Sequence, residues 1–208
     1  SVAESFSNGS VQQLGESNVR SLAAGDIYGD RELDLVLGTA AGQQIEVYFG
    51  SGYRTFIEYP LQVADNASND GIGLGDIDGD GDIDMIVANT GNQPNRVFAN
   101  DGNGNFQLTA EIDGPDRRDV VVIDLNGDGF LDLVFATVVA NAIYLGDGNG
   151  GFALSAQLGN ASSHAVQAAD LDGDSRPDLV FANVGAPSRI WFNQGDAPFQ
   201  THTALAIG

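Results

Sequence analysis

Carboxylates on alternate residues dominate the chemistry of one short stretch, residues 76–84. Five aspartates occupy every second position there, with Gly79 and Gly81 among the residues between them. Carboxylates this close together repel one another unless a cation lies among them, and Ca²⁺ accepts six to eight oxygen ligands from flexible loops. The glycines allow the tight curvature that aims alternate oxygens inward. The stretch predicts a calcium loop whose ligands are the side chains of Asp76, Asp78, Asp80 and Asp84 and the backbone carbonyl of Asp82.

The same spacing occurs in four loops, whose first aspartates lie 46 to 50 residues apart. We number them loop 1 (26–34), loop 2 (76–84), loop 3 (124–132) and loop 4 (170–178). A period of this length indicates a repeat architecture. Loops 3 and 4 supply the same kinds of ligand as loop 2, with a neutral amide at one position of loop 3. Their predicted ligands are Asp124, Asn126, Asp128, Asp132, Asp170, Asp172, Asp174 and Asp178, together with the carbonyls of Phe130 and Arg176.

Loop 1 departs from this pattern at its third position. Tyr28 stands where the other loops carry Asp or Asn, and a neutral phenol is a poor ligand for a hard cation. We therefore expect about three Ca²⁺ ions per chain as the cofactor. Weak or absent binding is expected of the remaining candidates in loop 1, which are Asp26, Asp30, Glu32 and Asp34.

An EF-hand is the first alternative, because it also begins with alternating oxygen ligands. Its twelfth position carries a bidentate glutamate, whereas loops 2, 3 and 4 have Val87, Phe135 and Phe181 there. The residues that follow each loop are apolar runs rich in β-branched and aromatic side chains, which predict buried strands. The sequence therefore favours a loop that joins two strands over a helix–loop–helix.

Each repeat contains four short segments with strand character separated by turn residues, which predicts one propeller blade per repeat. The first segment is rich in small residues at 21–25, 71–75 and 165–169, as expected where innermost strands converge, whereas 120–123 is bulkier. We predict an all-β propeller of four-stranded blades, with the calcium loops between the first and second strands. One domain, 1–208, would contain an extra strand at about 1–15 and repeats at about 16–63, 64–113, 114–158 and 159–208.

The composition narrows the function classes. The 208 residues include no cysteine, which excludes disulfides and thiolate metal sites, and the net charge is −21. More than half of the 29 acidic residues lie in the four loops. So acidic a surface should repel nucleic acid and anionic membranes, and no apolar run is long enough to span a bilayer. Because the chain begins at Ser1 with no visible signal peptide, we expect a mature or trimmed product.

Two sequence fragments carry a family resemblance. Loop 3 runs into Leu-Asp-Leu-Val-Phe-Ala (131–136), and a turn of the second repeat reads Asn-Gly-Asn-Phe (103–106). Over residues 16–208 the pattern resembles the FG-GAP/VCBS repeats of integrin α-type β-propellers. The resemblance implies extracellular adhesion, lectin-like sugar binding or an accessory role beside an enzyme, without catalytic residues in the repeat. Such propellers usually have seven blades, so four repeats could form a four-bladed ring, half of a two-chain ring or a piece of a longer protein.

A polar residue of changing type lies six positions before each loop, where the innermost strand begins on the face opposite the loops. Such variation at a fixed position of a repeat is typical of a binding surface, although solvated loop-edge residues would show it too. An aromatic residue also recurs at one phase of the third strand, where packing between blades is a commoner role than stacking on a sugar. The candidate ligand-binding residues are Arg20, Asp70, Arg118, His164 and Trp191.

Three function classes remain open. We favour a calcium-stabilised recognition or adhesion module that binds glycan or protein. The alternative is a structural repeat module or accessory domain of a larger secreted protein or enzyme. An enzyme is disfavoured, because each complete loop fills its metal site with protein oxygens and neither His164 nor His202 is spaced for a triad.

Location and partners follow from the metal. Calcium sites of extracellular modules have Kd of roughly 10⁻⁴–10⁻³ M, so we expect a secreted protein, extracellular or periplasmic. The expected partners are a glycan or protein ligand and a second copy that completes a larger ring. Nucleic acid and membrane insertion are not expected.

Overall fold

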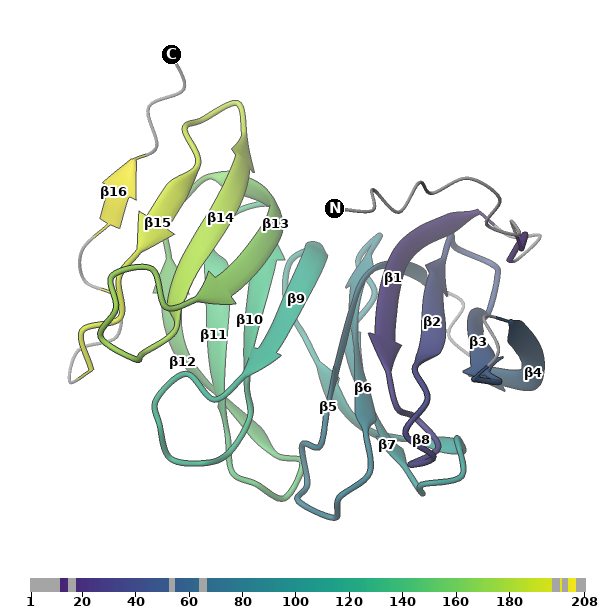
Figure 1. Ribbon diagram of the computed structural model, residues 1–208. Helices are drawn as coiled ribbons and strands as arrows, with labels where there is room; N and C mark the ends of the chain where they lie inside the picture. Colours follow the sequence, from purple (N-terminus) through teal and green to yellow (C-terminus); the bar gives the residue numbers. More distant parts are fainter. Residues whose placement is uncertain are drawn as a thin grey trace, which may run out of the picture.

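The computed structural model describes residues 12–14, 18–52, 55–63, 67–195, 199 and 202–204, and every regular element in them is a β-strand. Sixteen strands form four antiparallel sheets, each built from four strands that are consecutive in the chain. The sheets are the blades of a β-propeller (Figure 1). The predicted fold class is confirmed. Among the described residues no helix could cross a bilayer.

The four blades have the same strand order. Blade 1 contains β1 (Val19–Gly25), β2 (Asp34–Thr39), β3 (Ile45–Gly50) and β4 (Phe56–Val63). Blade 2 contains β5 (Ser68–Gly75), β6 (Asp84–Thr90), β7 (Asn95–Asn100) and β8 (Phe106–Ile112). Blade 3 contains β9 (Arg117–Ile123), β10 (Asp132–Thr137), β11 (Asn141–Gly146) and β12 (Phe152–Leu158). Blade 4 contains β13 (Ser162–Ala169), β14 (Asp178–Val184), β15 (Arg189–Trp191) and β16 (His202–Ala204).

The hydrophobic core lies between consecutive blades. The second strand of each blade is apolar on both faces, and in β10 every residue is buried. At the contact of blades 1 and 2, Val36 and Val47 pack with Met85 and Phe98. Equivalent clusters fill the contacts of blades 2 and 3 and of blades 3 and 4. Each sheet is therefore held by its neighbours rather than by a core of its own.

The innermost strands approach closely where small residues face large ones. A Cβ built on Gly71 would lie 2.6 Å from the Cα of Asp119, and one built on Gly73 would lie 2.5 Å from a methyl group of Val122. The bulky first strand of blade 3 thus packs on the glycine-rich first strand of blade 2. This pairing explains why 120–123 departs from the small-residue pattern.

The blades follow one another in an arc. β1 contacts β5, β5 contacts β9, and β9 contacts β13. In the described part of the chain β1 and β13 share no comparable contact, and they lie at the two ends of the row of innermost strands (Figure 1). Blades 1 and 4 therefore each keep one sheet face that no other blade covers.

Two expectations about the chain ends have different outcomes. The fourth strand predicted for the last repeat is the short β16 (His202–Ala204). The extra strand predicted at about 1–15 lies outside the described residues except for 12–14. The domain and repeat boundaries remain predictions.

Candidate metal loops and the opposite face

All four acidic loops join the first and second strands of their blades, as predicted. In loop 2 the first aspartate organises the turn, because Asp76 accepts the N–H groups of Gly79 at 2.8 Å and Gly81 at 3.1 Å. Both glycines have positive φ, 80° and 98°. The residues equivalent to Gly81 in loops 1 and 4, Arg31 and Ser175, adopt φ of 74° and 69°. The loop conformation is therefore retained even where a side chain makes it costly.

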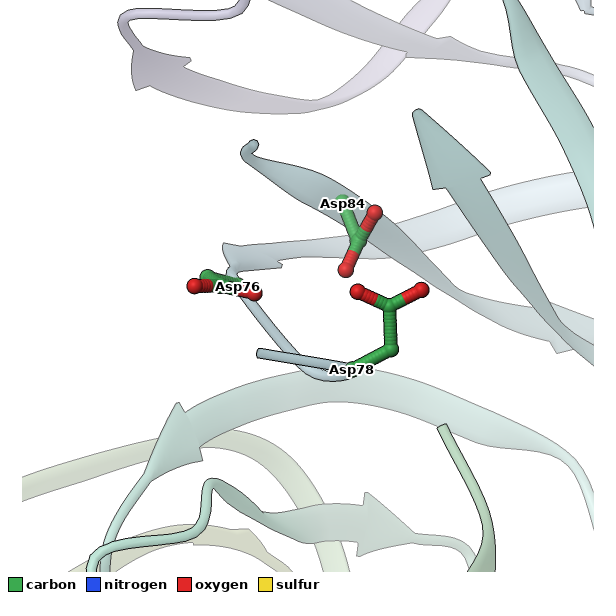
Figure 2. A group of neighbouring side chains, drawn as sticks. All are labelled: Asp76, Asp78 and Asp84. Atoms are coloured by element: carbon green, nitrogen blue, oxygen red, sulfur yellow. The ribbon is translucent and has the colours of Figure 1, made fainter. Parts of the chain in front are cut away.

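Three carboxylates converge in loop 2. Oxygens of Asp76, Asp78 and Asp84 all lie within 4.8 Å of one another, and the carboxylates of Asp78 and Asp84 face each other (Figure 2). Several hard oxygen donors around one point are the ligand set that Ca²⁺ requires, so these residues fit the predicted ion. Ligation by Asp80 and by the carbonyl of Asp82 remains a prediction.

Loops 3 and 4 differ in detail from loop 2. In loop 4, Asp170, Asp172 and Asp174 converge in the same way, but the guanidinium of Arg176 forms an ion pair with Asp174. A resident cation on a ligand competes with a metal ion. In loop 3, the amide of Asn126 donates to Asp128 at 2.9 Å, so two of the predicted ligands bond to each other. Metal binding by loop 3 remains a prediction.

The last aspartate of each loop has a structural role that the sequence did not reveal. Asp84 is fully buried, and it accepts the N–H groups of Ile77 at 2.9 Å and Asn100 at 2.8 Å. It thereby ties the loop to the end of the third strand. Asp34, Asp132 and Asp178 make the same two kinds of bond.

These buried carboxylates have shifted pKa values. Burial raises the pKa of Asp84 to about 6, although the N–H groups of Asn100 and Ile77 oppose that shift. Burial also raises the pKa of Asp34 and of Asp132. The charged form is therefore costly in the protein alone, and a bound cation would stabilise it.

Tyr28 of loop 1 packs between blades. Its ring meets Phe49 edge-on, with centroids 4.9 Å apart. On the side of blade 2, a Cβ on Gly104 would lie 2.5 Å from the Tyr28 ring, so only glycine fits beside it. The side chain that replaces a metal ligand thus fills the contact with the next blade. Weak or absent metal binding by Asp26, Asp30, Glu32 and Asp34 remains a prediction.

The opposite face carries four of the five candidate ligand-binding residues at equivalent positions. Arg20, Asp70, Arg118 and His164 are each the extra residue of a β-bulge in the innermost strand, where the register shifts. Bulges re-aim side chains and are over-represented beside functional sites. Their common backbone role follows from the strand pairing, and ligand binding by them remains a prediction.

The bulge residues of blades 1 and 2 interact directly. Arg20 and Asp70 form an ion pair at 3.2 Å, and Ser68 bridges them, accepting from Arg20 at 3.2 Å and donating to Asp70 at 2.8 Å. Thr90 donates to the other oxygen of Asp70 at 3.3 Å. Arg118 is half-buried, and its Nε has no hydrogen-bond partner within the described residues.

A pocket of about 520 Å³ adjoins this network between blades 1 and 2. Ser68, Thr90, Gln93 and Arg96 line it together with three small residues. Arg96 also pairs with Glu111 at 3.1 Å, so the pocket is close to neutral. It offers hydroxyl, amide and guanidinium groups to a ligand.

Trp191 is misplaced among the candidate ligand-binding residues. It is 8% exposed and lies in the apolar cluster between blades 3 and 4. Strand pairing puts it opposite Leu179, as Phe98 lies opposite Met85. The aromatic position of the third strand is therefore a packing position, which is the role that the sequence favoured.

Sequence reasoning missed Arg117, which is buried beside Arg118. Its guanidinium lies 4.2 Å from the ring centre of Phe135 and 5.0 Å from that of Tyr144. It donates to the Tyr144 hydroxyl at 2.8 Å and to the carbonyl of Asp113 at 3.1 Å. Burial lowers its pKa. No local signal distinguishes it from the neighbouring arginine, because its burial depends on rings from two other strands.

Two solved structures share the fold. A lectin from Agrocybe aegerita, studied for its specific recognition of non-reducing terminal N-acetylglucosamine, matches with a TM-score of 0.62 and 23% identity over 87% of this chain and 50% of its own. BBS1N in complex with ARL6DN, soaked with lead, matches with a TM-score of 0.58 and 13% identity over 93% of this chain and 56% of its own. The chain thus spans about half the length of these structures.

Sequence comparison identifies the repeat. No curated protein matches the chain. The model of the FG-GAP-like repeat matches residues 76–135 and 124–181, which together make up about half of the chain and contain loops 2, 3 and 4. These matches agree with the shared loop geometry and with the repeated blade. The chain belongs to the FG-GAP-like repeat family.

Proposed function

We propose that this chain is a calcium-stabilised, non-catalytic recognition module that works outside the cytosol and binds a glycan or a protein. The observation that carries the proposal is the convergence of Asp76, Asp78 and Asp84 in a loop that recurs from blade to blade. Carboxylates drawn together in this way are stabilised by a hard cation. Extracellular Ca²⁺ modules bind with Kd of roughly 10⁻⁴–10⁻³ M, a concentration range that the cytosol does not reach.

The non-catalytic part of the proposal rests on how buried acids are used. Asp119, whose pKa is raised by burial, accepts the N–H groups of Val120 and Val166 at 2.9 Å each. The second of these bonds crosses from blade 3 to blade 4. Both carboxylate oxygens of Asp119 therefore accept backbone N–H groups, as do those of the last aspartate in each loop.

The pocket between blades 1 and 2 is the proposed ligand site. Ser68 and Thr90 hydroxyls, the Gln93 amide and the Arg96 guanidinium suit the dense hydroxyls of a sugar. The Agrocybe aegerita lectin recognises a terminal N-acetylglucosamine, which makes a glycan the first ligand class to test and a protein the second. A purely structural module is the second candidate, favoured by the uncovered faces of blades 1 and 4.

A glycan array with the calcium-loaded protein tests the ligand class. We expect binding that is lost in chelator and is weakened in Gln93→Ala, because Gln93 is an exposed pocket residue. Gln107→Ala is the matched control, since it removes the same exposed amide from the outer strand of the same blade. If neither sugars nor extracellular proteins bind the calcium-loaded chain, the recognition role is wrong and the structural module is the better account.

A second copy of the chain is also a proposed partner. The two sheet faces without a neighbouring blade provide the surfaces for it.

A further inference from the structure

Blade 4 leaves exposed the face that blades 1, 2 and 3 bury. The second residue of each loop points toward the following blade. Ile27, Ile77 and Leu125 occupy this position in the first three blades and are 1%, 3% and 5% exposed. Leu171 occupies it in loop 4 and is 48% exposed. The sequence thus keeps a large apolar residue at a position that burial alone would justify.

The second strand of blade 4 repeats this observation. Val180 lies two residues after the buried aspartate that ends the loop, as Val134 does in blade 3, and Ala182 corresponds to Ala136. Val134 and Ala136 are fully buried. Val180 is half-buried and Ala182 is exposed. An apolar blade face of the ordinary kind therefore has no covering layer in this part of the chain.

Blade 1 also has an exposed apolar position, on its opposite sheet face. Leu22 on β1 is 61% exposed, whereas the residues at its position in the later blades, Ile72, Val120 and Val166, are 8%, 4% and 0% exposed. Strand pairing fixes the equivalence, because each of these residues lies opposite the third residue after the loop's last aspartate. The exposed side of β1 is the side that, in blades 2, 3 and 4, packs on the preceding blade.

We propose that blade 1 of a second copy packs on the exposed face of blade 4, and that two copies join head to tail in one closed ring of eight blades. The two faces are the two halves of a contact already present three times in the chain. At the contact of blades 3 and 4, Ala136 and Val166 belong to one apolar cluster. Ala182 and Leu22 are their equivalents.

The symmetry of such a ring accounts for both exposed faces at once. Within one chain β1 and β13 lie at opposite ends of the arc, so the faces cannot meet (Figure 1). In a pair related by a two-fold axis, each copy covers the blade 4 face of the other, and both contacts are identical. A closed ring leaves no blade face exposed, and closure is the usual outcome in oligomers of identical chains.

Light scattering in calcium-containing buffer tests the proposal by mass. We expect twice the mass of one chain, and one chain's mass for Ala182→Arg and for Leu22→Asp, because each places a charge in an apolar contact. Val139→Arg is the control, since Val139 is a similarly exposed apolar residue in the turn between β10 and β11. We expect it to remain a dimer.

Mixing the two disrupted variants gives the sharper result. A ring of one Ala182→Arg chain and one Leu22→Asp chain has one unaltered contact and one that pairs Arg with Asp. The mixture should therefore recover the dimer mass although neither variant does so alone. A single-chain mass for the unaltered protein, a series of growing oligomers or a failure of the mixture to recover would each overturn the closed ring. Melting curves with and without chelator test the metal loops separately. The light-scattering result therefore does not decide whether the loops bind calcium, and the melting curves do not decide whether the ring forms.

Discussion

Loops 1 and 2 have nearly the same backbone and different chemistry. In both, the first aspartate accepts two N–H groups from the turn, and the last one accepts the N–H of the second loop residue. Loop 2 adds Asp78, whereas loop 1 has Tyr28, which packs on Phe49. The comparison separates two functions of one motif. The first and last aspartates shape the loop in both, and we predict that the third position, Asp78 or Tyr28, decides whether the loop can also hold a metal ion.

Removal of calcium should have the largest effect. A site filled at a hundredfold excess over its Kd stabilises the fold by about 2.7 kcal/mol, so three independent sites would contribute roughly 8 kcal/mol. That is comparable with the whole stability of a typical domain, about 5–15 kcal/mol. We expect chelator to lower the melting temperature sharply or to unfold the protein at neutral pH. Equal melting temperatures with calcium and with chelator would mean that the loops are not structural metal sites.

The next largest effect should distinguish the fifth positions of loops 2 and 1. Asp80 and Asp30 make the same local bond, each accepting an N–H two residues on at 2.9 Å. In calcium, Asp80→Ala should cost about 2.7 kcal/mol through loss of one site, and Asp30→Ala about 0.5 kcal/mol or less. In chelator the two variants should be equally stable. Denaturant titration measures both pairs, and equal losses in calcium would show that Asp80 is not a ligand.

The change of folding stability with pH should have opposite signs with and without calcium. The pKa of Asp84 is raised to about 6, above its unfolded value of 3.8. Without metal, the folded state binds more protons than the unfolded state between these values, so stability falls as pH rises from about 4 to 6. With calcium, stability should rise over the same range, because the metal needs the deprotonated carboxylates. Melting curves at several pH values check this, and parallel slopes with and without calcium would contradict it.

The smallest effect should appear in loop 4. Arg176→Ala removes the cation that pairs with Asp174. Because an exposed ion pair contributes up to about 1 kcal/mol, calcium affinity at loop 4 should rise by up to about fivefold. Calorimetry resolves the site if loop 2 serves as the internal control. Unchanged affinity would show that Arg176 leaves Asp174 at no cost in free energy when the metal binds.

Sequence patterns within one repeat predicted most of the strands in that repeat. The buried strands predicted from the apolar runs after loops 2 and 3 are β6 (Asp84–Thr90) and β10 (Asp132–Thr137). Apolar runs after a fixed loop determine such strands without help from distant residues. The starts of the innermost strands were missed by two or three residues, because a β-bulge there interrupts the regular spacing.

Features that depend on residues from several strands were not predictable. Arg117 looks like a surface residue in the sequence, yet rings from β10 and β11 enclose it. The side chain of Asn100 bonds the carbonyl of Ile27 in the preceding blade at 2.8 Å, a partner 73 residues away. The last aspartates were correctly placed in the loops, but their bonds to the third strand need the blade to be formed.

The consecutive order of strands within each blade has a consequence for folding. Among the described residues, ladder bonds join strands that are neighbours in the chain, and the main blade contacts join neighbouring repeats. Loop-closure costs are therefore low, and each blade can assemble on the one before it as the chain leaves the ribosome. In the isolated chain, blades 2 and 3 are flanked on both sides whereas blades 1 and 4 are flanked on one. Their opening free energies should differ accordingly, so amide protons in β6 and β10 should exchange more slowly than those in β2 and β14.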